Sequence, residues 1–60
     1  MKDYLKELGF AIDDKVSCQC VDDNEAWVGV VDRDSTDRYF IASDAITYYP
    51  VGADKLMLVD

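Results

Sequence analysis

Apolar residues recur at helical spacing at the start of the chain, and charged residues lie between them. The members of this stripe are Met1, Tyr4, Leu5 and Leu8. Gly9 follows, and glycine is favoured just past a helix end because it adopts the left-handed conformation at little cost. The pattern therefore predicts a short amphipathic helix over residues 1–9. A helix of about two turns is marginal alone in water, so its apolar stripe must pack against the rest of the domain.

From Asp13 onward the chain is rich in β-branched and aromatic residues, and polar clusters interrupt them every eight to twelve positions or so. This spacing is typical of a small antiparallel barrel or sandwich. It predicts five strands over residues 15–21, 26–32, 38–42, 46–51 and 56–59. Gly29 favours a bulge or strong bend inside the second strand, and Pro50 restricts the fourth strand to a sheet edge or a bend.

Residues 43–49 allow two interpretations. Ser43 is a possible N-cap of a short helix, whereas Thr47, Tyr48 and Tyr49 favour a strand. We prefer the strand because three consecutive residues have high strand propensity. The core predicted from the whole pattern comprises Leu5, Leu8, Val16, Cys18, Val28, Val30, Ile41, Leu56 and Leu58.

The strand pattern resembles a known family. It is carried by Asp14-Lys15-Val16, Trp27-Val28-Gly29-Val30-Val31, Tyr39-Phe40-Ile41, Tyr49-Pro50-Val51 and Ala53-Asp54-Lys55-Leu56-Met57-Leu58. These segments look like an SH3-like barrel of the Tudor or KOW kind over residues 13–59. The resemblance implies a single mainly β (α+β) domain over residues 1–60, with the N-terminal helix packed on a small five-stranded antiparallel barrel. The chain lacks the basic residues usual in KOW domains, so the resemblance does not extend to nucleic-acid binding.

Composition narrows the range of functions. The 60 residues contain 13 acids and 6 bases, a formal net charge of -7, and 50% of them are hydrophobic. That hydrophobic fraction is too high for a disordered acidic tail. The acidic balance argues against direct binding of nucleic acid or anionic membrane, because both need Lys and Arg to neutralise phosphates. No apolar segment is long enough for a membrane helix or a secretory leader, so we expect a cytoplasmic protein.

Catalysis and metal binding find little support in the sequence. The chain has no histidine, which excludes Ser-His, Cys-His and HExxH chemistry. Asp32, Asp34 and Thr36 match the start of an EF-hand loop, but the glycine and the bidentate glutamate that complete the motif are missing. Cys18 and Cys20 supply two thiolates where a structural zinc site needs four ligands. We therefore expect no enzyme activity, no cofactor and no metal, with the two cysteines as free thiols on the core face of the first strand.

The acidic excess is concentrated in one part of the chain. Residues 22–44 contain seven acids and two arginines, a local net charge of -5, and aromatic residues lie in and beside this segment. Aromatic faces attract cations, and nearby carboxylates add Coulomb attraction. The predicted partner-binding residues are Trp27, Asp32, Asp34, Asp37, Tyr39, Asp44, Tyr48 and Tyr49. The alternative interpretation is that the aromatic residues fill the core and the acids are solvated turn residues.

We expect a non-enzymatic module that docks on a basic protein surface, such as that of a nucleic-acid-binding protein. By size and charge alone the chain is similar to small acidic phage-encoded inhibitors of the anti-CRISPR or DNA-mimic type. One alternative is a Tudor-like aromatic cage that reads a cationic peptide or a methylated side chain. Another is a structural subunit that oligomerises through a strand edge or the helix stripe. The sequence leaves the oligomeric state and the viral or cellular origin open.

Overall fold

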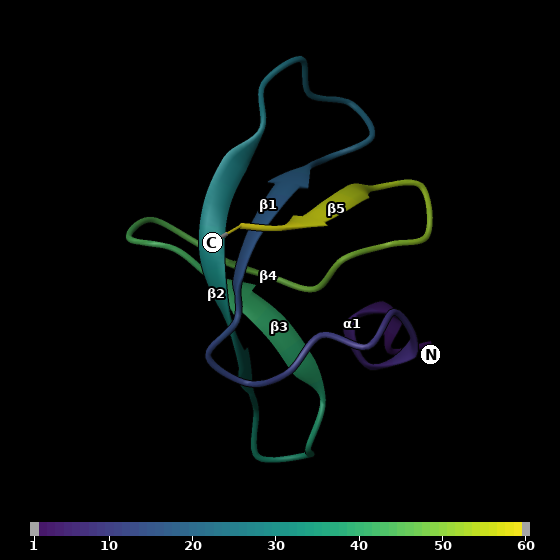
Figure 1. Ribbon diagram of the computed structural model, residues 1–60, viewed down its shortest axis with the longest axis vertical. Helices are drawn as coiled ribbons and strands as arrows, with labels where there is room; N and C mark the ends of the chain where they lie inside the picture. The colour runs from purple at the N-terminus through teal and green to yellow at the C-terminus, as the bar shows by residue number, and fades with distance from the viewer. Residues whose placement is uncertain (1, 60) are drawn as a thin grey trace.

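A computed structural model describes residues 2–59, which form one short helix and five strands (Figure 1). The elements are α1 (Tyr4–Glu7), β1 (Lys15–Gln19), β2 (Trp27–Arg33), β3 (Tyr39–Ala42), β4 (Thr47–Tyr48) and β5 (Lys55–Leu58). The strands form one antiparallel sheet in the order β4-β3-β2-β1-β5. The domain is therefore mainly β with one short helix, as predicted. Its hydrogen-bonded sheet is open, with β4 and β5 at the two edges.

The helix is anchored to the sheet by its N-cap residue. Asp3 Oδ1 accepts a hydrogen bond from the backbone N–H of Lys6 at 3.2 Å, and Asp3 Oδ2 accepts one from the backbone N–H of Tyr39 at 2.9 Å. Leu5 is fully buried, but Leu8 is 61% exposed, so its predicted place in the core is wrong. Because α1 ends at Glu7, Leu8 leaves the helical repeat one residue before Gly9, which has a φ of 88°. Met1 lies outside the described residues.

Strand β2 decides which residues reach the core. Val16 lies opposite Gly29 and Ile41 opposite Val31, and residues opposite one another share a face of the sheet. Gly29 and Val31 therefore face inward. The predicted core positions of Val28 and Val30 are wrong, because these alternate residues point outward and are 50% and 39% exposed. Because every residue in this run is apolar, the sequence alone does not show which alternate residues are buried.

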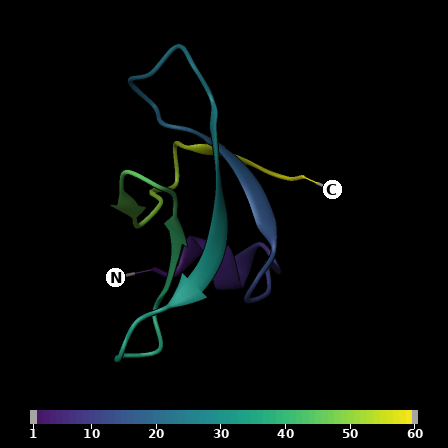
Figure 2. The ribbon, with the colours of Figure 1, turned by 90° about the vertical axis from the view of Figure 1, so that its left-hand side faces the viewer.

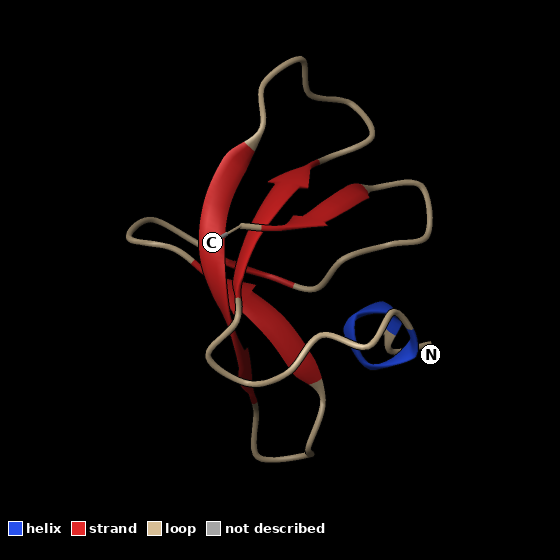
Figure 3. Ribbon diagram, in the orientation of Figure 1, coloured by secondary structure: helices blue, strands red, loops and turns tan. Residues whose placement is uncertain are grey.

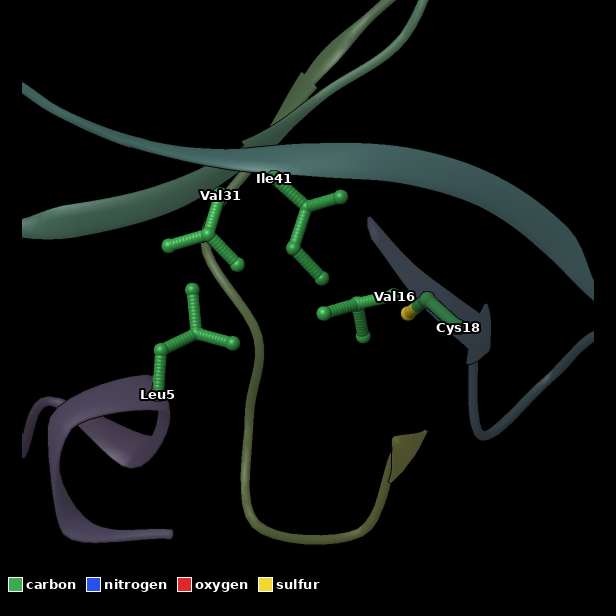
Figure 4. Packing of buried hydrophobic residues seen from close by; sticks show 5 residues of the cluster. All are labelled: Leu5, Val16, Cys18, Val31 and Ile41. Atoms are coloured by element: carbon green, nitrogen blue, oxygen red, sulfur yellow. The ribbon is translucent and has the colours of Figure 1, made fainter. Parts of the chain in front are cut away.

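The core lies between α1 and the concave side of the sheet (Figure 4). Its fully buried members are Leu5, Val16, Cys18, Val31 and Ile41. Leu56 packs against this cluster, as predicted. Leu58 was also predicted to be buried, but it is 57% exposed. It lies in β5, an edge strand that is hydrogen-bonded only to β1. Val31 was not among the predicted core residues.

The fourth predicted strand is shorter than expected. Residues 43–46 form a tight turn in which Ser43 Oγ accepts hydrogen bonds from the N–H groups of Ala45 and Ile46, at 3.4 and 3.3 Å. The strand interpretation of residues 43–49 is thus confirmed for Thr47–Tyr48, and β4 lies at a sheet edge before Pro50, as expected.

The molecule has two distinct ends and two distinct faces. The β1–β2 loop and the β2–β3 loop lie at opposite ends of the long curved strand β2 (Figure 2). Helix α1 lies on the concave side of β2, and the β3–β4 turn projects toward the other side (Figure 3). No helix in residues 2–59 has the length and apolar character needed to span a membrane.

Candidate functional site

The β2–β3 loop is organised around Asp34, one of the predicted binding residues. Asp34 Oδ1 accepts hydrogen bonds from the Thr36 N–H at 2.9 Å, the Thr36 hydroxyl at 2.7 Å and the Arg38 N–H at 3.0 Å. Asp34 Oδ2 accepts another from the Tyr49 hydroxyl at 2.8 Å. These donors hold the pKa of Asp34 well below its usual range, and the carboxylate raises the pKa of Tyr49. Asp34 therefore shapes the loop, and both of its oxygens are occupied.

Asp37, in the same loop, is paired with bases of the chain itself. Its carboxylate lies 3.1 Å from Lys6 Nζ and 3.6 Å from Arg33 Nη1. Lys6 also donates a hydrogen bond to the backbone carbonyl of Asp37. Each pair is solvent-exposed and contributes little to stability. Together they offset most of the negative charge at this end of the molecule.

Two of the predicted tyrosines already carry an internal cation. Lys6 Nζ lies 4.9 Å from the ring centroid of Tyr39, and the Arg38 guanidinium lies 5.3 Å from that of Tyr49. Tyr49 also packs against Phe40, with the ring centroids 5.7 Å apart. One face of each tyrosine is thus occupied by a group of the same kind that a partner would supply.

The β1–β2 loop, at the opposite end, has a different electrostatic character. Asp22, Asp23 and Glu25 are exposed, and within residues 2–59 their carboxylates form no ion pair and accept no hydrogen bond. The loop backbone is nevertheless tied to the strands: Gln19 Nε2 donates to the Asp23 carbonyl at 3.1 Å, and the Asp23 N–H donates to the Cys20 carbonyl at 3.0 Å. Three unpaired negative charges are therefore held at one end of the sheet.

Trp27 begins β2 directly after this loop. A cleft of about 500 Å³ is lined by residues 23–27, so Asp23, Glu25 and Trp27 border the same space. The half-buried indole packs edge-to-face on Tyr48, with centroids 5.8 Å apart and planes at 81°. The two rings touch each other directly and both pack against the core, so a cation cannot lie between them.

The remaining predicted residues lie apart from this end. Asp32 accepts a hydrogen bond from the Arg33 N–H at 2.8 Å, and Asp44 lies exposed in the β3–β4 turn. The predicted site is therefore divided: Trp27 and Tyr48 meet near the β1–β2 loop, Asp34 and Tyr49 meet near the β2–β3 loop, and Asp44 lies on the outer side of the sheet. Tyr39 stands beside the helix.

Sequence reasoning counted Asp22, Asp23 and Glu25 in the acidic excess but left them out of the predicted site. The signal that singles them out is the distribution of bases, because no lysine or arginine occurs between Lys15 and Arg33. A carboxylate in the middle of such a stretch has no cation near it in sequence. Among the described residues, no cation from another segment forms an ion pair with these carboxylates, although Lys55 lines a hollow together with Asp23.

The cysteines are free thiols with different environments. Cys18 is fully buried and Cys20 is half-buried. Desolvation raises the pKa of the Cys18 thiol to about 12, with Cys20 nearby adding to the shift. Cys18 is therefore a neutral core side chain. Within the described part of the chain, no three Cys, Asp or Glu side chains gather in a way that would hold a metal ion.

Comparison of the chain with models of protein families, with curated proteins and with solved structures gives no match in any of the three. The functional argument therefore depends on the geometry and charge of the molecule.

Proposed function

We propose that the protein is a non-enzymatic binding module that docks on a basic surface of a partner protein through its acidic end, defined as Asp22, Asp23, Glu25 and Trp27. The observation that carries this proposal is the unpaired state of the three carboxylates in residues 2–59. Asp37, in contrast, has cations of this chain beside it. A basic partner gains most where it does not have to displace an internal cation.

The cleft at the acidic end suits an arginine or lysine side chain of the partner. The indole attracts a cation by about 0.5–2 kcal/mol, depending on how far the cation is desolvated. At an effective dielectric constant near 20, a carboxylate about 4 Å away adds attraction on the order of 4 kcal/mol before desolvation is subtracted. Tryptophan is also one of the residue types that most often dominate the binding energy of a protein interface.

The partner we propose is a nucleic-acid-binding protein, because such proteins expose the strongest basic surfaces and carboxylates can take the place of phosphates there. This assigns the protein to the class of small acidic inhibitors of the phage-encoded, DNA-mimic type, acting in the cytoplasm. We also propose that the sheet is an SH3-like barrel. The return of β5 to pair with β1, and the helix over the concave side, support this assignment.

The test uses a short arginine- and lysine-rich peptide as the probe and the fluorescence of the single Trp27 as the signal. Neutralising the acidic end with the triple variant Asp22→Asn, Asp23→Asn, Glu25→Gln should weaken binding more than about tenfold. The control is Glu7→Gln, Asp32→Asn, Asp37→Asn, which makes the same change of net charge at the other end. We expect it to weaken binding less than about threefold.

Binding should also weaken steeply as salt rises from 50 to 500 mM, because screening removes attraction between exposed charges. Equal losses in the two triple variants would show that only net charge matters and would overturn the assignment to the acidic end. Affinity that is unchanged by salt would overturn the electrostatic basis of the proposal.

A second candidate, an aromatic-cage reader of methylated lysine or arginine, is favoured by the position of Trp27 beside Asp23 and Glu25 at one cleft. A reader would be saturated by a single small cation, whereas a surface-docking module needs several charges at once. Titration with trimethyllysine and with the unmodified amino acid separates the two. A fluorescence change that saturates for trimethyllysine alone supports the reader, and no change with either removes it.

A further inference from the structure

The face of the sheet opposite α1, here called the outer face, carries an apolar strip. Across β1, β2 and β5, Ser17, Val28 and Met57 lie opposite one another, so they share this face. Val30 extends the strip along β2. Val28, Val30 and Met57 are 50%, 39% and 67% exposed, although they occupy the middle of a sheet. Exposed apolar side chains grouped on one face of a small domain are a feature of surfaces that contact another protein.

The β3–β4 turn overhangs this strip and forms one wall of a groove. The groove measures about 590 Å³ and is lined by Lys15 on the β1 side, Val28 and Val30 in the middle, and Asp44 in the turn. Within residues 2–59, neither Lys15 nor Asp44 forms an ion pair or a side-chain hydrogen bond. The apolar strip thus has an unpaired cation on one side and an unpaired anion on the other.

Charge indicates what covers this face. The outer face has Lys15 and Lys55 against Asp32 and Asp44, a balance that contrasts with the formal net charge of -7 for the whole chain. A strongly basic partner would be drawn to the acidic end instead, and a strongly acidic surface would meet no excess of positive charge on this face. A second copy of this chain presents the same balanced face, so the contact itself brings equal numbers of lysines and carboxylates together.

The arrangement is also self-complementary, which a symmetric dimer requires. A two-fold axis that lies in the interface and runs along the strip exchanges its two sides. Lys15 of one copy then faces Asp44 of the partner subunit, and the reverse pair forms at the same time. We propose that the outer face is the site at which two copies of this chain associate, with Val28 and Val30 at the centre and the Lys15–Asp44 pairs on either side.

The dimer is a separate property from the proposed function, since the acidic end lies at the top of β2 and the outer face along its side (Figures 1 and 2). The surface available is small, because the chain exposes only 4179 Å² in total. We therefore place the interface at the low end of the usual range, below about 1,200 Å² in total, with a dissociation constant in the micromolar range.

The first test is sedimentation of the full chain from about 1 μM to about 1 mM, which spans the micromolar range. Val28→Lys should weaken association at least about tenfold, because it places a charge at the centre of the interface. Val51 is 49% exposed and lines a hollow with Lys2 and Tyr4, away from the outer face. Val51→Lys is the matched control because it makes the same change of charge. It should change association less than about twofold. Circular dichroism verifies that both variants are folded.

The second test is a charge exchange. Lys15→Glu and Asp44→Lys should each weaken the dimer about threefold to tenfold, and the double variant, which keeps the net charge of the native chain, should restore it to within about twofold. Asp44→Lys is decisive because it makes the protein less negative. Repulsion between whole molecules therefore predicts tighter association, and the Lys15–Asp44 pairing predicts weaker association.

A strictly monomeric chain at 1 mM, equal effects of Val28→Lys and Val51→Lys, or a double variant weaker than either single variant would each overturn the proposal. Salt distinguishes this inference from the proposed function. Raising it from 50 to 500 mM should leave dimerisation unchanged or stronger, because the apolar strip is insensitive to screening and the weaker Lys15–Asp44 attraction is offset by the weaker repulsion between acidic molecules. The same change weakens binding to a basic peptide.

Discussion

Tyr48 and Asp54 join the strand at one edge of the open sheet to the turn that leads into the strand at the other edge. The Tyr48 hydroxyl donates a hydrogen bond to Asp54 Oδ2, and the Val51 N–H donates to the same oxygen at 2.9 Å. Asp54 Oδ1 accepts a hydrogen bond from the Val21 N–H at 3.0 Å. One carboxylate therefore links β4, the turn before β5 and the start of the β1–β2 loop, next to the acidic end.

We predict that Asp54→Ala destabilises the fold by about 2–3 kcal/mol, because three hydrogen bonds to one carboxylate are lost together. Tyr48→Phe removes only one of them and should cost about 0.5–1.5 kcal/mol. Urea denaturation followed by Trp27 fluorescence measures both. Equal stability of Asp54→Ala and the native chain would show that water replaces all three partners.

Gly29 is the position at which any side chain should damage the sheet. A Cβ there would lie 2.5 Å from Ile41 Cγ2 and 2.7 Å from the backbone oxygen of Ala42, and the latter cannot move without breaking β3. We expect Gly29→Ala to destabilise the fold by about 1–3 kcal/mol through overpacking. Gly9→Ala is an informative comparison, because a Cβ at Gly9 meets nothing within 4 Å and only the positive φ of 88° opposes it. Its cost should be about 1–2 kcal/mol, without disturbance of the core.

The two leucines of the helical segment should respond differently to truncation. Leu5→Ala leaves a cavity in the core beneath α1 and should cost about 2–5 kcal/mol, a large part of the stability of a 60-residue domain. Leu8→Ala should change stability by less than about 0.5 kcal/mol, because Leu8 is 61% exposed. Thermal denaturation of the pair provides the comparison. A cost of Leu8→Ala as large as that of Leu5→Ala would mean that something covers Leu8 in solution.

The thiols should react at very different rates. We expect a disulfide reagent at pH 8 to modify Cys20 readily and Cys18 only as the protein unfolds, since Cys18 is buried and its pKa is raised to about 12. The Cys20→Ser variant isolates the buried thiol, and mass spectrometry counts the labels. Because the folded pKa of Cys18 is above the unfolded value of about 8.5, its stabilising effect is complete below that pH and is lost as the pH rises toward 12. Rapid double labelling of the native protein would contradict the buried placement.

Asp34 should make the stability of the fold sensitive to acid. Hydrogen bonds from Thr36, Arg38 and Tyr49 lower its pKa, so its stabilising effect is present above the unfolded value of about 3.9 and is lost as the pH falls below it. We expect Asp34→Asn to be less stable than the native chain at pH 7, with the difference shrinking between about pH 4 and pH 2. Asp32→Asn, the control, changes a carboxylate with a single backbone partner. A constant difference for Asp34→Asn across this pH range would contradict the assignment.

The local pattern of apolar and polar residues predicted much of the fold. The alternation of Val16 and Cys18 with polar neighbours predicted both the strand and its buried face, and Gly9 marked the end of the helical segment. The pattern failed where it contains no alternation. In the run from Trp27 to Val31 every residue is apolar, so only pairing with β1 and β3 shows that Val31 is buried and that Val28 and Val30 are not.

The sequence predicted the residue types of the candidate site but not their arrangement in space. The sequence identified acids beside aromatic residues, yet it could not show that Lys6, far away along the chain, lies against Asp37 and over the ring of Tyr39. Charge pairing acts through space, so a count over a segment misses the cations that folding brings to it. The negative charge of the β2–β3 loop is offset in this way, while among the described residues no ion pair offsets that of the β1–β2 loop.

Composition and periodicity were enough to predict a small, acidic, mainly β domain with a short amphipathic helix, because both are local properties of the chain. The fold was needed to show which carboxylates remain unpaired, which tyrosines lie beside a cation of the chain, and which valines of β2 face outward. Each of these depends on contacts between segments distant in sequence, and such contacts exist only once the sheet has formed.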